Sequence, residues 1–270
     1  MRPGLPRLAK RMNNPLASVP VVILAGGLGT RLQPALPELP KGLAPIGGDP
    51  FLGLQIQLLR EQGARRFVLC VGHRAEQIQA ALGDGRRWNV RIDYSVERAG
   101  LLGTGGALKL AEPFFSPRAL VLNGDTYFAL DYARFLRRHL RELEREPPVA
   151  TIAVARAGDA RSCGRTRLDP AGSSVVAFEE KRAGAPEMGG WLNGGAYVIE
   201  REVLELLAAN RVYSLEREVF PRLLRLGMRV AVVRSSRPFY DIGTPQRLDR
   251  FRRLRSARGR ERARKAASSP

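Results

Sequence analysis

The chain has 270 residues, of which 44% are hydrophobic, and a formal net charge of +19 at pH 7. This length allows one large domain or two small ones, with enough apolar residues for a substantial core. No stretch approaches the roughly 20 apolar residues of a membrane helix, so a membrane partner is not expected. Two cysteines make no disulfide framework and have no metal-ligand cluster beside them, which favours a reducing, cytoplasmic setting.

Most of the positive charge lies at the two ends. Residues 1–18 carry four basic residues and no acidic one, and residues 251–270 carry eight basic residues and one acidic one. We therefore predict a basic, disordered N-terminal segment (1–18), one compact domain (19–250) and a basic C-terminal tail (251–270). The ends lack interleaved aromatic residues that could stack on bases, so nucleic acid is not the expected partner. The basic body suits an anionic substrate.

The first half of the chain alternates strands with helices. Short apolar runs predict strands at residues 19–25, 66–71, 90–96, 119–122 and 149–154. Apolar residues spaced by three and four predict helices at residues 51–61, 74–82 and 131–145. Asp131 can cap the last of these helices, in which His139 is expected at the surface. This alternation predicts an α/β fold with a parallel sheet covered by helices on both faces.

The second half has a different pattern. Residues 165–168, 175–179 and 191–199 are predicted to be antiparallel strands around a turn at residues 169–172. Residues 202–208 and 214–226 are predicted to be helical, the second helix being broken or kinked at Pro221. A buried strand follows at residues 229–233.

A glycine-rich segment follows the first predicted strand. Residues 26–32 read Gly-Gly-Leu-Gly-Thr-Arg-Leu, and Lys41 follows nearby. Glycines let a ligand approach the backbone amides, and Arg31 and Lys41 add fixed positive charge, a combination that suits a polyphosphate. The spacing is not that of a Walker loop, and prolines interrupt it where a Gly-x-Gly-x-x-Gly loop would enter a helix. A glycine-rich turn with surface cations is the alternative interpretation.

Two aspartates are candidates for metal binding. Asp125 follows the strand at residues 119–122, at the carboxyl end where ligands of such sheets bind. A carboxylate there can hold Mg²⁺ together with phosphate oxygens, or it can simply belong to an Asn-Gly-Asp turn. Asp241 is the second candidate, because Thr244 and Pro245 already suffice to cap and begin the next helix.

A second glycine-rich stretch, Gly-Thr-Gly-Gly at residues 103–106, precedes a helical pattern. Free amides at the start of a helix can receive a base, ribose or phosphate group, and an ordinary capped helix is the alternative.

Together these motifs resemble the signature of the sugar-1-phosphate nucleotidylyltransferases. The resemblance covers residues 19–250 and includes Phe-Glu-Glu-Lys at residues 178–181 and Asn-Gly-Gly at residues 193–195. Residues 43–46, 102–107, 122–128 and 214–216 are most similar to the D-glycero-D-manno-heptose 1-phosphate guanylyltransferase subgroup. The resemblance implies a Rossmann-like nucleotide-diphospho-sugar transferase fold (GT-A-like), a three-layer α/β/α sandwich with a mixed sheet.

The resemblance also implies roles for the matching residues. The expected catalytic residues are Arg31 on the leaving phosphates, Lys41 on the transferring group and Lys181 on the sugar phosphate. Asp125 and Asp241 are expected to bind Mg²⁺. The expected nucleotide-binding residues are Leu24, Ala25, Gly26, Gly27, Gly29, Thr30, Gly103, Thr104 and Asn123. The expected sugar-phosphate-binding residues are Gly164, Glu180, Lys181 and Asn193. Departures from the family pattern are Gly42 for proline, Gly105 for alanine and Cys163 for tyrosine.

The implied reaction transfers a nucleotidyl group from a nucleoside triphosphate to a sugar 1-phosphate and releases pyrophosphate. GTP and the heptose 1-phosphate are favoured, and UTP with a hexose, amino-sugar or muramic acid 1-phosphate is the alternative. A nucleotide-sugar sensor without turnover is a further alternative, which the intact charged residues disfavour. A homo-oligomer is left open.

Overall fold

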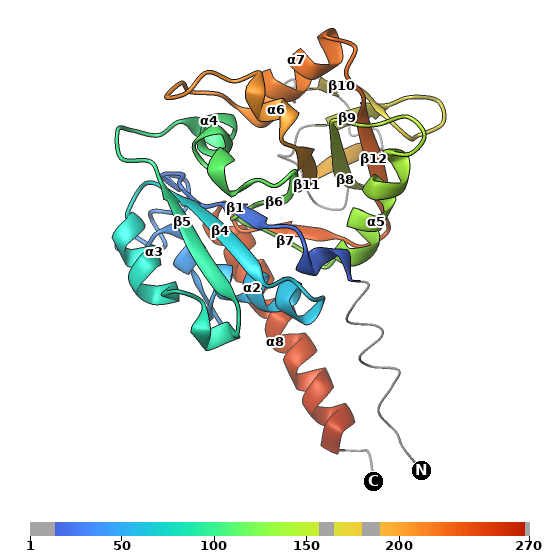
Figure 1. The fold of residues 1–270 in the computed structure, drawn as a ribbon. Coiled ribbons are helices and arrows are strands. Elements are labelled where there is room, and N and C mark those ends of the chain that lie inside the picture. Colours follow the sequence, from blue (N-terminus) through green and yellow to red (C-terminus); the bar gives the residue numbers. More distant parts are fainter. Residues whose placement is uncertain (1–13, 157–164, 180–189, 268–270) are drawn as a thin grey trace, which may run out of the picture.

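The computed structural model describes residues 14–156, 165–179 and 190–267 (Figure 1). Within these residues a nine-stranded mixed sheet has the strand order β10-β9-β11-β6-β1-β4-β5, and β8 pairs with both β11 and β12. The strands of this sheet are β1 (Val21–Leu24), β4 (Arg66–Val71), β5 (Arg91–Val96), β6 (Arg118–Asn123), β8 (Ala150–Arg156), β9 (Arg165–Leu168), β10 (Val175–Glu179), β11 (Trp191–Glu200) and β12 (Val230–Ser235). Strands β1, β4, β5 and β6 are parallel, whereas β11 runs antiparallel to β6, β8 and β9.

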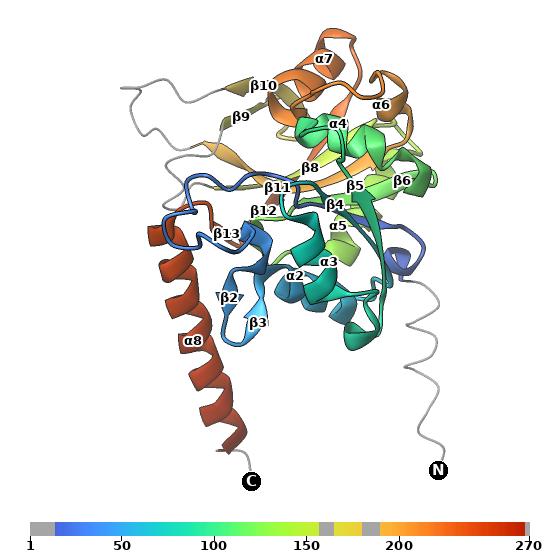
Figure 2. The ribbon, with the colours of Figure 1, turned by 90° about the vertical axis from the view of Figure 1, so that its left-hand side faces the viewer.

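The central strands are buried on both faces because their side chains alternate between two helical layers. Val21 and Ile23 pack in a cluster with α2 (Phe51–Glu61), α3 (Ala75–Leu82) and α5 (Tyr132–Glu142). Val22 packs in a second cluster with α4 (Gly103–Leu110), α6 (Glu202–Glu205) and α7 (Phe220–Arg225). Figure 2 shows the two sets of helices on opposite sides of the sheet. The expected three-layer α/β/α sandwich with a mixed sheet is therefore confirmed.

Two short ribbons lie beside the main sheet. Strand β13 (Phe239–Asp241) pairs antiparallel with β7 (Thr126–Phe128), and β2 (Pro45–Ile46) pairs with β3 (Asp49–Pro50). A third apolar cluster joins these ribbons to the start of α8 (Pro245–Ala267), a helix that extends away from the body (Figures 1 and 2). The ribbon β7–β13 brings the end of the domain back to the segment that follows β6.

Residues beyond both expected domain boundaries pack against the body of the protein. Helix α8 runs through residue 250, and Phe251 is only 2% exposed, with its ring 5.6 Å from Phe51 and 5.3 Å from Tyr127. At the other end, Leu16 is fully buried in a short 3-10 turn. One buried apolar residue is enough to attach a basic segment to the core. The net charge of the segment gives no sign of such a contact. None of the described helices has the combination of length and apolar composition that a membrane crossing requires.

Several helices differ from their predicted extent. The predicted helix at residues 131–145 ends at Glu142, and the one at residues 202–208 ends at Glu205. The helical segment continues through Pro221: a five-residue π-helix (Leu215–Val219) leads directly into α7, and Pro221 lies in the first turn of α7.

His139 is fully buried, which corrects the expectation of a surface residue. Its ring nitrogens lie 2.8 Å from Thr151 Oγ1 and 2.7 Å from Glu200 Oε1. Tyr132 and Leu136 lie on the same face of α5, at the spacing that places side chains together on a helix. The apolar periodicity of α5 was therefore a better guide to His139 than the arginines around it.

We predict that Phe251→Ala destabilises the protein by about 3 kcal/mol or more, because it removes a buried aromatic ring from the cluster that anchors α8. Chemical denaturation of the full chain measures this change in the free energy of unfolding. Arg253→Ala, at an exposed position two residues away, is the control and should change that free energy by less than about 0.5 kcal/mol. Equal stability of the two variants would show that the domain does end before Phe251.

Candidate active site

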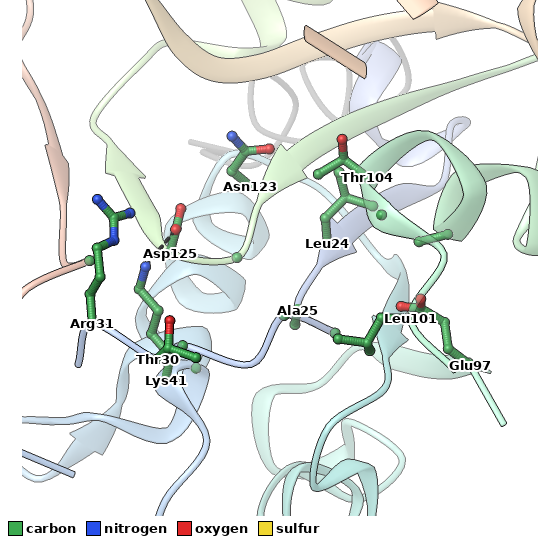
Figure 3. Close-up of a pocket in the computed structure, with 18 residues that line it drawn as sticks. Leu24, Ala25, Thr30, Arg31, Lys41, Glu97, Leu101, Thr104, Asn123 and Asp125 are labelled. Atoms are coloured by element: carbon green, nitrogen blue, oxygen red, sulfur yellow. Dashed lines mark hydrogen bonds and ion pairs between the residues drawn. The ribbon is translucent and has the colours of Figure 1, made fainter. Parts of the chain in front are cut away.

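The carboxyl ends of the four parallel strands meet at one edge of the sheet and frame a cavity of about 360 Å³ (Figure 3). The register aligns Leu24 with Cys70 and Asn123, and Val71 with Val96, so the residues after these strands lie side by side. The expected site residues that line this cavity are Leu24, Ala25, Gly26, Gly27, Gly29, Thr30, Arg31, Lys41, Gly103, Thr104, Asn123 and Asp125. The structure thus brings the two glycine-rich segments and the Asn-Gly-Asp turn together.

Lys41 and Asp125 form an ion pair at one end of the cavity. Lys41 Nζ donates to Asp125 Oδ2 at 2.6 Å, and their side chains are 15% and 37% exposed. Burial raises the pKa of Asp125, but the charge and hydrogen bond of Lys41, the hydroxyl of Thr126 and the charge of Arg31 outweigh it and leave that pKa below its ordinary value. Asp125 is therefore ionised at neutral pH, in a site with two cations close by.

The ribbon β7–β13 places Asp241 beside this pair. Asp241 lies opposite Thr126 in the ribbon, and the next amide, of Ile242, donates to the carbonyl oxygen of Asp125 at 3.0 Å. The Asp241 carboxylate accepts from Arg247 at 2.6 Å and from the amide of Gly243, which lines the cavity. A Cβ on Gly243 would lie 3.1 Å from Lys41 Nζ and 3.3 Å from the Arg31 guanidinium. The two aspartates and three cations therefore converge.

The donor set fits a divalent cation bound together with substrate. Asp241 pairs with Thr126 in the ribbon, so its carboxylate lies close to that of the preceding residue, Asp125. Mg²⁺ binds through one or two carboxylates plus phosphate oxygens and keeps several waters. Among the described residues there is no group of three or more histidine, cysteine, aspartate or glutamate side chains that could hold an ion by itself. Phosphate oxygens of a substrate would have to complete such a site.

The Asn-Gly-Asp turn is fixed by close backbone packing. The Gly124 amide donates to the Leu24 carbonyl at 2.9 Å, and a Cβ on Gly124 would lie 2.6 Å from that oxygen. Gln55 Nε2, from α2, donates to the carbonyl oxygens of Asn123 at 3.0 Å and Thr126 at 2.8 Å. The position of Asp125 is thus set from both sides by groups on other elements.

Thr104 and Asn193 belong to one polar network. Thr104 Oγ1 accepts from the Leu215 amide at 2.8 Å and lies 3.3 Å from Glu216 Oε2. The Tyr197 hydroxyl donates to the other oxygen of Glu216 at 3.0 Å and accepts from Asn193 Nδ2 at 2.9 Å. Asn193 itself does not line the cavity that contains Thr104. Glu216 therefore connects the expected nucleotide and sugar segments.

Other expected sugar-site residues cannot be placed by this structure. Gly164, Glu180 and Lys181 lie outside the described residues, as does Cys163, one of the departures from the family pattern. The other two departures have a packing explanation. A Cβ on Gly42 would lie 2.5 Å from Leu52 Cδ1, and one on Gly105 would lie 2.9 Å from both Tyr213 and Val219, so larger residues would not fit without rearrangement.

Sequence reasoning missed Glu97 and Leu101, which line the same cavity. Glu97 is the first residue after β5 and occupies the position relative to its strand that the glycine-rich loop has relative to β1. The rule that located Asp125 at a carboxyl end would also have located Glu97.

Comparison with known proteins gives this arrangement a family. A family model described as nucleotidyl transferase matches residues 20–253, nearly all of the body. The chain belongs to the nucleotidyl transferase family. The matched range extends past residue 250 to include Phe251, in agreement with the packing of α8 on the domain.

Relatives of this nucleotidyl transferase act on different sugars. The chain is 32% identical over 225 residues to D-glycero-alpha-D-manno-heptose 1-phosphate guanylyltransferase of Campylobacter jejuni, covering 83% of this chain and 95% of the relative. It is 33% identical to mannose-1-phosphate guanylyltransferase of Mycobacterium tuberculosis and 32% identical to UTP--glucose-1-phosphate uridylyltransferase of Synechocystis. The matches cover 84% and 82% of this chain but only 62% and 59% of those two longer proteins.

Solved structures agree on the fold. HddC from Yersinia pseudotuberculosis, crystallised with GMP-PN, is 29% identical, has a TM-score of 0.74, and the match covers 86% of this chain and 97% of that one. An inositol-1-phosphate CTP transferase from T. maritima has a TM-score of 0.68 at 19% identity, with 88% and 94% of the chains covered, and shows the fold alone. The fold is that of the nucleotide-diphospho-sugar transferases.

We predict that ionised Asp125 stabilises the folded protein and that this contribution disappears in acid. The folded-state pKa lies below the ordinary carboxyl value of 3.8, so the contribution is present above that value and is lost as pH falls through the lowered pKa. Asp125→Asn should therefore be less stable than the parent at pH 7, and the difference should shrink below about pH 4. Urea unfolding at several pH values measures this, and a difference that stays constant down to pH 3 would contradict it.

Proposed function

We propose that this protein transfers a guanylyl group from GTP to a sugar 1-phosphate, with pyrophosphate as the second product. The observation that carries the proposal is the Lys41–Asp125 pair at one end of a cavity lined by glycine amides, with Asp241 beside it. Such an end provides the positive charge and metal-binding carboxylates that a triphosphate requires.

The chemistry needs positioning more than acid–base catalysis. An oxygen of the sugar phosphate attacks the α-phosphorus of GTP, and the bond from that phosphorus to the pyrophosphate oxygen breaks. Because the attacking oxygen is already anionic, no protein group must remove a proton. The residues must instead hold two mutually repelling anions together and stabilise the charge that spreads over the transferring phosphoryl oxygens. In this proposal Arg31 binds the leaving phosphates and Lys41 the transferring group.

Asp125 and Asp241 are the proposed ligands of Mg²⁺, which when bound would offset the phosphate charge and orient the phosphate oxygens. Lys181 and Glu180 remain the proposed contacts to the sugar phosphate and the sugar, and Asn193 and Gly164 are the other residues proposed for that site. Lys41 would exchange part of its contact with Asp125 for a phosphate oxygen, since an ammonium group can donate three hydrogen bonds.

A heptose 1-phosphate is the proposed sugar, supported by the Campylobacter enzyme, which the chain matches over nearly its whole length. Because the Synechocystis relative is a uridylyltransferase, UTP with a hexose phosphate is the alternative pair of substrates. A sensor without turnover is disfavoured because Arg31, Lys41, Asp125 and Asp241 are all present and converge. The cytoplasm is the proposed compartment, where a free thiol such as Cys70 persists.

We predict pyrophosphate release that requires Mg²⁺, GTP and a sugar 1-phosphate together. The experiment pairs each of GTP, UTP, CTP, ATP and dTTP with a panel of sugar 1-phosphates that includes the heptose, and measures pyrophosphate by a coupled assay. Release with GTP and the heptose phosphate is the expected result. Release with UTP alone would show that the nucleotide substrate is UTP and not GTP. If the protein binds nucleotide but releases no pyrophosphate, the sensor would be favoured.

We predict that Asp125→Ala lowers turnover by roughly two or more orders of magnitude, because it removes a charge that holds the metal and orients Lys41. Initial rates at saturating substrates measure the change, and circular dichroism checks the fold. Asp93→Asn is the control: this aspartate pairs with Arg91 on β5, away from the cavity, and its loss should leave the rate unchanged. Full turnover by Asp125→Ala would refute the metal assignment.

A further inference from the structure

The two candidate metal ligands differ in their relation to the cavity. Asp125 lines it, whereas Asp241 does not, although Gly243, whose amide donates to Asp241 Oδ1, is part of the lining. The other oxygen, Oδ2, accepts from Arg247 Nη1 at 2.6 Å. Both oxygens of the Asp241 carboxylate are therefore engaged, and one of them pairs with a full positive charge.

Arg247 is fixed by the first turn of α8. The side chain of Thr244 accepts from the Arg247 amide at 3.4 Å, and the next residue, Leu248, is fully buried in the apolar cluster that anchors this helix. The side chains of Arg247 and Asp241 are only 24% and 19% exposed, so water and salt screen their attraction incompletely. Helix packing therefore holds the residue that carries this guanidinium beside the Asp241 carboxylate.

Arg247 differs from Lys41, which pairs with Asp125 in a similar way. Lys41 lines the cavity and can contact a phosphate oxygen, whereas Arg247 lies outside the lining, so its charge stays with Asp241. Three positive charges, including that of Arg31, thus surround the two carboxylates. A divalent cation that entered alone would add to this excess of positive charge.

This excess acts in opposite directions on a bare metal ion and on a complex of metal with nucleotide. A positive charge next to a carboxylate lowers the affinity of that carboxylate for another cation, as it does for a proton. A nucleoside triphosphate brings more negative charge than one divalent cation neutralises, so their complex is a net anion. The same positive charge therefore attracts the complex and repels the free ion.

We propose that Arg247, by pairing with Asp241, keeps free divalent cations out of the site and favours their binding as complexes with a nucleoside triphosphate. The inference rests on the proposed function, because it takes Asp125 and Asp241 as the metal ligands. A carboxylate can accept about four contacts in all, so Asp241 can bind the metal of such a complex while it still accepts from Arg247 and Gly243. The first turn of α8 thereby takes part in ligand binding.

The test is Arg247→Gln, which removes the charge and keeps a side-chain amide that can donate to Asp241. Mn²⁺ is the probe, because electron paramagnetic resonance measures the free ion directly. Without nucleotide, we expect the dissociation constant for Mn²⁺ to fall roughly tenfold, the lower end of the effect that a neighbouring unit charge has on the proton affinity of a carboxylate. At saturating Mn²⁺, we expect the dissociation constant for GTP, measured by calorimetry, to rise.

Opposite shifts in the two constants separate an electrostatic role from a structural one, because a distorted site would weaken both kinds of binding. A dissociation constant also does not depend on the fraction of folded protein. Arg253→Gln is the matched control: it removes the same charge from an exposed position farther along α8, and both constants should equal those of the parent.

If Arg247→Gln binds free Mn²⁺ no more tightly than the parent does, the proposal is overturned. Weaker binding of free Mn²⁺ would overturn it equally, by showing that Arg247 supports the metal ligand. A parent protein that binds GTP but binds no Mn²⁺ in its presence would instead refute the metal assignment, and with it the mechanism of the proposed function.

Discussion

The ion pair between Lys41 and Asp125 is the contact on which the candidate site depends. It joins residues 84 positions apart, one in the segment after β1 and one after β6. The parallel register of those strands places Leu24 beside Asn123, so the two loops must meet at the same edge. The pair is partly buried, so it also stabilises the fold at neutral pH. Its main consequence is chemical: it holds opposite charges where, in the proposed function, phosphates and a metal ion bind.

Close approach of backbone is the second constraint on this edge. Gly124 lies against the carbonyl of Leu24, and Gly26 leaves the space that Glu97 occupies. A Cβ on Gly124 would press against the backbone at the end of β1, and a Cβ on Gly26 would displace the Glu97 carboxylate. The cavity can therefore combine cations at one end with a carboxylate at the other only because its floor is bare backbone. The glycines at these positions therefore determine where the charged groups lie as well as how closely the backbone segments approach.

The network through Glu216 connects the two halves of the domain. Burial, and next the charge of Glu216, raises the pKa of Tyr197, whose hydroxyl therefore stays protonated and donates to that carboxylate. The π-helix that carries Glu216 brings it within reach of both Tyr197 and Thr104. Polar groups that satisfy one another in this way favour a single arrangement of the surrounding elements. Asn193 and Thr104, on segments expected to contact different substrates, are thus oriented together.

The amino-acid sequence was enough to predict the α/β layers, most strand positions and the residues at the cationic end of the cavity, because apolar periodicity and glycine-rich turns are local signals. It also placed Asp125 at the correct sheet edge, since that edge follows from strand direction. The folded structure was needed to show that Phe251 anchors α8 and which segments Glu97 and His139 face, although a strand end before Glu97 and apolar spacing around His139 were signals in the sequence. Each of these depends on contacts between distant segments, whereas the signals in the sequence are local.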